Sequence, residues 1–372
     1  MKKAAVLLLI VAVIGAGYYF TRGNSARQSA VPANDGQVYE ISIAHIVNED
    51  NTWHKASLFF KEYVEEKAGG RIEVKIYPNN QMGSEMDVIK SIMTDGGADI
   101  TFTGESMQSV IPELGILGVP YLMRSSEVLA EAVFGSYSKE LESFAIRNTD
   151  TNSAMGVGES FLEALIDSES AYKQLEELML EQANMKVLGY FERGPRNVTA
   201  NKPIRTPDDM KGLVIRVPAS PITVAAMEAL GAKPTPMASA EVFTSLRQGT
   251  IAAQEDTLAM IKTGNFYEVQ KYLCRTEHLR PCVYIAMSNS KFESLPLELQ
   301  EIVAEAGAKM QEHEHELFMK EEAELEDFLK EKGMIFVDDV DRDAFAEKAL
   351  SGVEKVLPEK IKPLYEQIKA MD

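Results

Sequence analysis

The sequence has few cysteines, a shortage of basic residues and no long hydrophobic run after residue 20. Its 372 residues include two Cys and one Trp, and 38 Lys and Arg stand against 57 Asp and Glu, a net charge of −19. A surface this acidic repels phosphate backbones, and no run of basic residues interleaved with aromatics reverses the sign locally. We therefore exclude nucleic acid as a partner. The 45% hydrophobic content excludes a disordered chain, and the length favours two lobes.

Sequence motifs of several enzyme and metal-binding classes are also missing. No Gly-x-Ser-x-Gly, P-loop, His-Glu-x-x-His or Gly-rich dinucleotide turn follows a predicted strand. No Cys-x-x-Cys occurs, and His313 and His315, two positions apart on a predicted helix, diverge too far to share a metal ion easily. The sequence therefore predicts no metal, no cofactor and no enzymatic activity.

The two cysteines, Cys274 and Cys282, leave two interpretations open. In an oxidising compartment they can pair if their Cα atoms lie within about 7 Å of each other. Two small, buried, unpaired side chains explain them equally well.

The first 30 residues have the pattern of an export segment. Lys2 and Lys3 precede an apolar run from Ala4 to Phe20, and a polar stretch follows. This pattern is typical of a cleaved signal peptide, although the run is long enough for an uncleaved single-span anchor. No cysteine directly follows the run, so a lipid-modified cysteine is excluded. Both alternatives predict an exported, periplasmic protein.

From Tyr39 onward, segments of period 2 alternate with segments of period 3.6, which is typical of α/β architecture. The pattern up to Thr103 predicts a β-α-β-α-β run, with a capping box from Ser84 to Asp87 starting its second helix. A strand near Lys186 is expected to begin a second such lobe. Residues 148–182 between the two form a predicted helical excursion of unknown purpose.

One long helix dominates the C-terminal third of the chain. It is predicted from Pro296 to about Glu331, with Ser294 as its N-cap. At about 1.5 Å per residue it is roughly 50 Å long, enough to lie across both lobes.

Three sequence motifs, in this order, carry a specific resemblance. They are Pro78-Asn-Asn-Gln81-Met-Gly83, Thr206-Pro-Asp-Asp-Met-Lys-Gly212-Leu-Val-Ile-Arg216-Val-Pro218, and Leu230-Gly-Ala-Lys-Pro-Thr-Pro236-Met. Together they resemble the TRAP transporter solute-binding proteins of the DctP type. The resemblance covers about residues 39–372, interrupted by the excursion at 148–182.

The resemblance implies a periplasmic-binding-protein-like α/β fold of two lobes, joined by hinge strands and spanned by the long helix. In that family the chain crosses between the lobes more than once. We therefore expect lobe I to contain residues 37–192 and 282–321, and lobe II to contain residues 193–281 and 322–372.

The same resemblance implies roles for three charged residues. Arg216 matches the family arginine that holds the ligand carboxylate in a two-toothed salt bridge, for which a planar guanidinium is suited. Arg196 matches a second arginine near the cleft, and Glu105 matches an acid on the opposing lobe. His45, Asn48 and Asn51, at and after the first strand, are further predicted ligand contacts because the carboxyl ends of strands meet the crevice in open α/β sheets.

Two departures from the family pattern predict a polar ligand. Asp256 replaces the asparagine of the usual Gln-Glu-Asn-Pro, and Ser239 stands where the family often has a phenylalanine. An ionised Asp256 repels a ligand carboxylate unless Arg196 or Arg216 neutralises it, or the ligand supplies a donor there. These changes favour a hydroxylated or amino-substituted acid, such as a sugar acid.

The function implied by the resemblance is that of the extracytoplasmic solute-binding subunit of a TRAP secondary transporter. It is expected to be a monomer that closes on an organic acid, C4-dicarboxylate-like or a sugar acid, and delivers it to membrane subunits. The alternative is a membrane-tethered periplasmic sensor of an organic acid that signals to a partner protein. An enzyme using Glu105 and Asp256 as an acid–base pair is disfavoured, since it requires turnover of the bound ligand.

Overall fold

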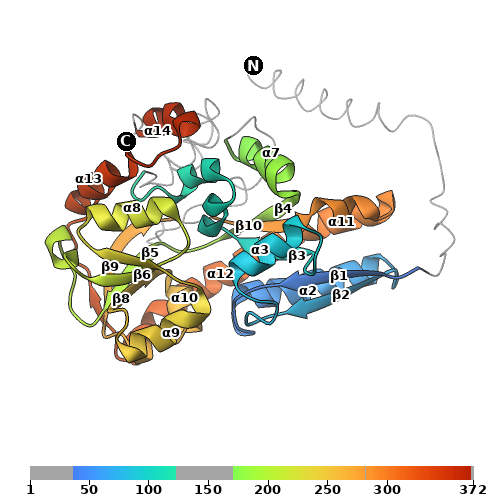
Figure 1. Cartoon of the computed structure of the whole chain (residues 1–372). Coiled ribbons are helices and arrows are strands. Elements are labelled where there is room, and N and C mark those ends of the chain that lie inside the picture. Colours follow the sequence, from blue (N-terminus) through green and yellow to red (C-terminus); the bar gives the residue numbers. More distant parts are fainter. Residues whose placement is uncertain (1–36, 123–170, 281, 370–372) are drawn as a thin grey trace, which may run out of the picture. The chain divides into compact units, whose positions relative to one another are not determined.

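Two β-sheets with helices packed against them form the described part of the protein (Figure 1). The computed structural model describes residues 37–122, 171–280 and 282–369. The elements from β1 onward belong to one compact unit, Tyr39–Asp372. The predicted leader and most of the predicted excursion at 148–182 lie outside the described residues; α7 (Ala171–Ala183) covers the end of the latter.

The first sheet contains the predicted β-α-β-α-β run, which is confirmed. Its strand order is β2-β1-β3-β10-β4, with the first three strands parallel and β10 antiparallel to both of its neighbours. The elements are β1 (Tyr39–Ala44), α2 (Thr52–Lys67), β2 (Ile72–Tyr77), α3 (Glu85–Met93), β3 (Ile100–Thr103), β4 (Met185–Glu192) and β10 (Cys282–Ser288).

The N-terminus of α3 is formed by the predicted capping box. The Ser84 hydroxyl accepts from the Asp87 backbone N–H, and the Asp87 carboxylate accepts from the Ser84 N–H at 2.9 Å. The cap fixes the start of α3, so that Glu85 is its first residue, beside the carboxyl end of β3.

Strand β4 corrects the prediction that a second lobe begins near Lys186. It pairs with β10 at the edge of the first sheet and has no partner strand in the second. The side-chain pattern of β4 is that of any buried strand, so hydrophobic periodicity alone does not predict which sheet the strand joins.

The second sheet contains β5 to β9 and β11, in the order β11-β9-β5-β8-β6-β7. Strands β8, β6 and β7 are parallel, whereas β5 is antiparallel to both β8 and β9. The strands are β5 (Arg196–Ala200), β6 (Val214–Val217), β7 (Lys233–Pro236), β8 (Ala253–Asp256), β9 (Tyr272–Leu279) and β11 (Ile335–Val337). Its helices are α8 (Pro221–Ala229), α9 (Ser239–Gln248), α10 (Leu258–Thr263), α13 (Arg342–Val353) and α14 (Lys362–Lys369).

The chain passes from one sheet to the other after β4, through residues 193–195 to β5, and again after β9, which ends at Leu279 shortly before β10 begins at Cys282. A few residues at element ends are the usual hinges of domain closure, because they can absorb a change in backbone angles. The strands thus divide between two sheets, while the residue boundaries expected for the two lobes stay a prediction.

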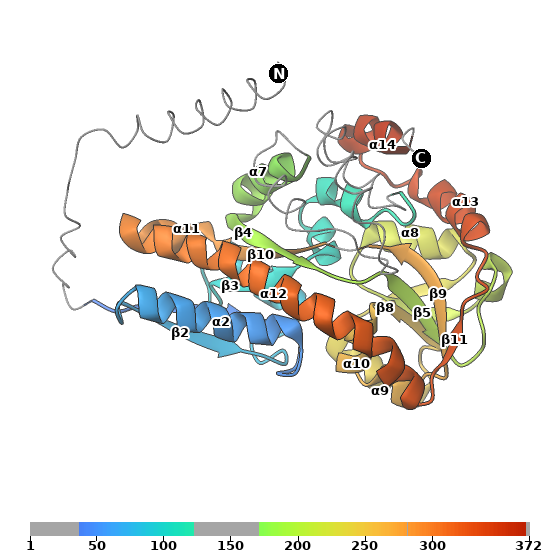
Figure 2. The same ribbon diagram turned by 180° about the vertical axis from the view of Figure 1, so that it is seen from behind.

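The predicted long helix is confirmed as α12 (Leu297–Glu331), which Figure 2 shows lying across both sheets. Pro296, not Ser294, occupies its N-cap position; Ser294 ends α11 (Asn289–Ser294), and its hydroxyl donates to Lys291 O. Gly307 allows close packing on the first sheet, since a Cβ there would lie 2.6 Å from Leu188 O. At its other end α12 packs on α10 through a cluster that includes Leu325 and Leu329.

Cys274 lies in β9 as a free, fully buried thiol, so the disulfide alternative does not hold. Its Sγ accepts from the Ile204 N–H at 3.3 Å, and burial raises its pKa to about 11. Across the described ranges, no helix combines the length and the apolar character needed to cross a bilayer.

Candidate ligand-binding site

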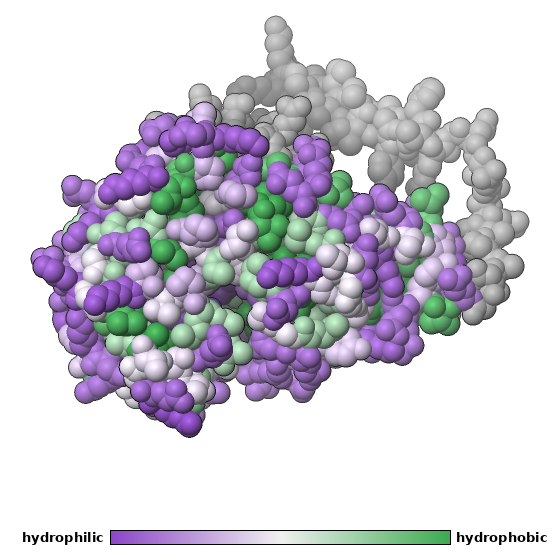
Figure 3. Space-filling view, in the orientation of Figure 1, coloured by the Kyte–Doolittle hydropathy of each residue, from purple (hydrophilic) through white to green (hydrophobic). Residues whose placement is uncertain are grey.

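A charged cavity of about 40 Å³ lies between the two lobes, where Figure 3 shows a narrow hollow. On the second sheet, the start of β5 and the end of β8 lie at the same edge because these strands are antiparallel, so that Arg196 and Asp256 come together. Arg216 joins them from the neighbouring strand β6, and Glu105 approaches from the first lobe, just after β3. The lining also includes Trp53, Glu85, Phe102, Thr103, Ser106, Arg193, Pro218, Ser239 and Met260.

Asp256 is the acceptor at which the arginines meet. Its Oδ1 is 2.8 Å from Arg193 Nη2 and 3.0 Å from Arg196 Nη1, and its Oδ2 is 4.0 Å from Arg216 Nη1. All of these side chains are at most 10% exposed. The negative charge of Asp256 is therefore surrounded by positive charge, which offsets the cost of burying it.

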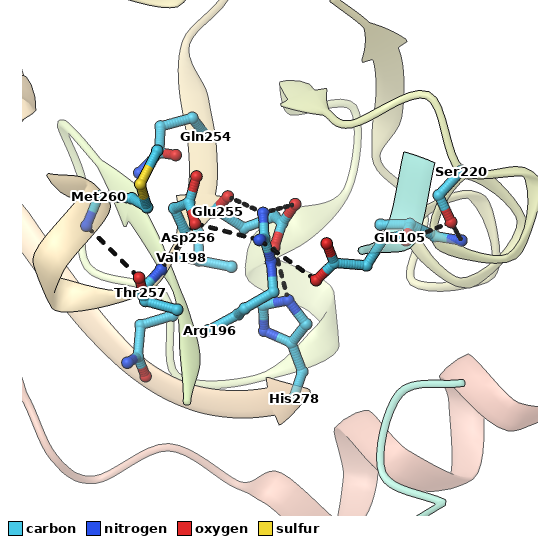
Figure 4. Close-up of polar contacts among 12 residues, drawn as sticks. Glu105, Arg196, Val198, Ser220, Gln254, Glu255, Asp256, Thr257, Met260 and His278 are labelled. Atoms are coloured by element: carbon cyan, nitrogen blue, oxygen red, sulfur yellow. Dashed lines mark hydrogen bonds and ion pairs between the residues drawn. The ribbon is translucent and has the colours of Figure 1, made fainter. Parts of the chain in front are cut away.

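Arg196 is committed to partners within the protein. Its Nη2 donates to Glu255 Oε1 at 2.9 Å and to Glu255 O at 2.8 Å, and Glu255 Oε2 lies 3.0 Å from His278 Nε2 (Figure 4). Burial alone would raise the pKa of Glu255, but the charge of Arg196 and the hydrogen bond from His278 outweigh it and hold the pKa at about 2. Arg196 and Glu255 therefore form an ionised, buried ion pair behind the cavity.

Arg216 has hydrogen-bond donors without a partner among the described residues. Its Nε donates to Met237 O at 3.0 Å, and within the described residues its terminal nitrogens donate no hydrogen bond. The residue is 5% exposed and lines the cavity. Burial lowers its pKa, a sign that its charge is incompletely compensated. Within the described residues, Arg193 and Arg196 each donate to a carboxylate, although Arg193 Nε has no partner there, whereas Arg216 donates only to a backbone carbonyl.

Two charged residues of the cavity were missed by sequence reasoning. Arg193 shares the Arg193-Gly-Pro-Arg196 motif, and its guanidinium lies 5.4 Å from the Trp53 ring centre. Glu85 is the residue that follows the capping serine, and its carboxylate accepts from Thr103 Oγ1 at 2.8 Å. The motif and the cap were both visible in the sequence, but neither shows which way a side chain points.

The other predicted site residues are divided between this cavity and other places. Glu105 and Ser239 line it; Ser239 is the first residue of α9, after an Ala238 N-cap. His45 is 2% exposed, its Nε2 is 3.2 Å from His54 Nδ1, and burial lowers its pKa to about 3.

Asn48 and Asn51 line a separate cavity of about 300 Å³. Asn51 caps α2 and also donates to Thr263 Oγ1 of α10 at 3.1 Å, a contact between the lobes. The ligand contacts expected of His45 and these two asparagines stay predictions. Within the described ranges no three metal-ligating side chains gather in one place.

Glu322 on α12 lies against the connection between β4 and β5. A Cβ added to Gly194 would sit 2.3 Å from Glu322 Oε1, and Oε2 is buried with no hydrogen-bond partner among the described residues. Burial raises the pKa of Glu322 to about 7, although the charges of Arg275 and Arg280 act to lower it.

This buried carboxyl predicts a pH-dependent stability. Because its folded pKa lies above the ordinary 4.5, the resulting stabilisation is fully present below pH 4.5 and is lost as pH rises through 7. The shift corresponds to roughly 3 kcal/mol. We expect Glu322→Gln to unfold at a higher temperature than the parent at pH 8 and at a similar one at pH 4.5. The exposed Glu324→Gln on the same helix is the control; equal curves for Glu322→Gln and the parent at pH 8 would contradict the prediction.

Two α/β lobes joined by short connections around a charged cavity define a periplasmic binding protein. Residues 43–151 and 159–359 match the family of bacterial extracellular solute-binding proteins, family 7, or DctP. The chain belongs to this family, as its motifs indicated.

Similar proteins are named for sugar acids or for solute binding in general. A solute-binding protein of Roseobacter denitrificans is 36% identical over 332 residues, 89% of this chain and 91% of the relative. A crystal structure of a TRAP periplasmic solute-binding protein from that species, with bound L-galactonate, has a TM-score of 0.76 at 34% identity and covers 89% of this chain and 99% of the other. The 2,3-diketo-L-gulonate-binding periplasmic protein of Escherichia coli is 26% identical over 327 residues, 87% of this chain and 89% of the relative.

Proposed function

We propose that this chain is the extracytoplasmic solute-binding subunit of a TRAP-type transporter and that it binds a sugar acid between its lobes. The observation that carries the proposal is Arg216, a buried arginine that lines the cavity and whose terminal nitrogens donate no hydrogen bond within the described residues; the nearer of them is 4.0 Å from Asp256 Oδ2. The relatives named for L-galactonate and 2,3-diketo-L-gulonate support the ligand class. The protein acts in the periplasm as a receptor and performs no catalysis.

Binding begins with the ligand carboxylate on Arg216, in a charge-assisted pair that keeps its strength when water is excluded. The cavity is lined by residues of both lobes, so a ligand bound in it contacts both. We expect the lobes to separate for the ligand to enter, with the change in backbone angles at residues 193–195 and at Arg280. The ligand favours closure only through contacts with both lobes, because equal affinity for the open and closed forms would shift nothing. The closed complex then delivers the acid to the membrane subunits.

A thermal-shift panel tests the proposal with the purified chain. The panel contains aldonates, uronates, C4-dicarboxylates, keto acids, amino acids and sialic acid. We expect a sugar acid to raise the unfolding temperature, since a ligand at 100 times its Kd stabilises a protein by about 2.7 kcal/mol. No shift from any acid, with no acid released from the denatured protein in a mass spectrum, would overturn it.

A further inference from the structure

The two walls of the cavity differ in chemical character. The lobe II wall carries the arginine fork of Arg216, while the lobe I wall carries Glu85 and Glu105 with the hydroxyls of Thr103 and Ser106. Within the described residues no lysine or arginine lies within ion-pair distance of Glu85. Among the residues that the structure describes, Glu105 pairs at 3.5 Å and 3.7 Å with two arginines that also hold Asp256.

Resting on the proposed function, we infer that Glu85 and Glu105 make the site specific for polyhydroxy acids with a single carboxylate. They bind the ligand's hydroxyls and reject its dicarboxylate counterparts. The sequence alone favoured a hydroxylated or amino-substituted acid, such as a sugar acid, but gave no residues that would reject a second carboxylate.

The hydrogen bonds of Glu85 show how it receives hydroxyls. Its Oε1 accepts from Thr103 Oγ1 at 2.8 Å and its Oε2 accepts from Ser106 Oγ at 2.9 Å. Each carboxylate oxygen has two acceptor sites, so one remains on each oxygen. The two hydroxyls also hold the carboxylate in one orientation beside the cavity. A polyol chain extending from Arg216 meets acceptors here, and its O–H groups are donors.

The charges of the cavity explain why a ligand with a second carboxylate should bind weakly. Three arginines and three acids line it, and Glu255 adds a further negative charge behind Arg196. The first ligand carboxylate takes the free donors of Arg216. A second carboxylate at the far end of the chain reaches the lobe I wall, where it faces Glu85 and Glu105. The cations nearest to that wall, Arg193 and Arg196, are already paired with Asp256. Like charges brought together in a buried site discriminate strongly.

Matched acids test the inference without any mutation. Calorimetry at pH 7 first finds the aldonate that binds best, and then measures the aldarate of the same length and hydroxyl configuration, such as galactonate against galactarate. We expect the aldonate to bind at least 100-fold more tightly. Hexanoate, which lacks hydroxyls, should show no measurable binding. An aldarate that binds as tightly as its aldonate would overturn the inference.

Two variants test the residues themselves. Glu85→Gln and Glu105→Gln keep hydrogen-bonding groups but remove the charge, so each should narrow the ratio between the two acids at least 10-fold, mainly by improving aldarate binding. Glu73→Gln, exposed on β2, is the matched control and should keep the parental ratio. Unchanged ratios in both cavity variants would overturn the role of these residues.

The outcome also separates this inference from the proposed function. If aldonate and aldarate bind equally, the protein is still a receptor for organic acids, and only the specificity is wrong. If no acid binds to the parent protein, the proposed function fails and the inference fails with it.

Discussion

Replacing Arg216 with alanine should weaken sugar-acid binding by about 2 to 5 kcal/mol, or about 30-fold to several thousand-fold. The arginine supplies the free planar fork of a buried cavity, so its loss leaves the ligand carboxylate desolvated and unpaired. Calorimetry with the best aldonate of the panel measures the effect. The fold should survive, since the one hydrogen bond that Arg216 makes within the described residues is to Met237 O, and the carboxylate oxygen paired with it there, Asp256 Oδ2, is 4.0 Å away.

Two matched variants sharpen this test. Arg216→Lys keeps the charge but loses the fork, so its affinity should fall between those of the parent and the alanine variant. Arg247→Ala removes an arginine that lies over the Phe243 ring on α9, outside the cavity lining, and should bind as the parent does. A loss of less than threefold in Arg216→Ala would refute the role assigned to this residue.

Replacing Arg196 should damage the fold itself. Arg196→Met leaves Glu255 buried and ionised with only His278 beside it, and breaking a buried ion pair in this way costs about 3 to 5 kcal/mol. Urea unfolding at pH 7 should therefore show a large fall in midpoint for Arg196→Met and a much smaller one for Arg216→Ala.

The double variant Arg196→Met/Glu255→Met separates charge from packing. Removing both partners leaves no unpaired charge between them, and replacing buried pairs with apolar residues of similar volume is often neutral for stability. We expect the double variant to recover much of the stability lost by Arg196→Met. Equal instability of the two would show that packing, and not the ion pair, is what Arg196 supplies.

The elements that the sequence predicted correctly are those whose signals are local. The box from Ser84 to Asp87 and the long run ending at Glu331 depend on side chains within a turn or two of one another. The prediction that Ser294 caps α12 was wrong because Ser294 is the last residue of a separate short helix, α11. Its hydroxyl donates to Lys291 O of that helix. The prediction for strand β4 was wrong because the strand pairs with β10, about a hundred residues later. Such a long-range pairing is not visible in the hydrophobic periodicity of β4 itself.

The charged cavity was predicted in part. Arg216, Arg196, Asp256, Glu105 and Ser239 were all proposed for one site, and all of them line the same cavity. Arg193 and Glu85 were not proposed because an arginine in a loop and a glutamate at a helix start are ordinary surface residues by type. The asparagines after β1 share a strand end with His45, yet the chain turns into α2 there and takes them to another cavity.

The sequence by itself determined the local elements, the acidic surface and the family, because these depend on residue type and on spacings of a few positions. Only the tertiary structure decided which of the cavity arginines donates to a neighbouring carboxylate and which does not. Arg196 and Arg216 both lie in buried strands of one sheet, but Glu255 takes up the donors of the first and leaves those of the second. Distance and burial govern the strength of an ion pair, and neither is recorded in the order of the residues.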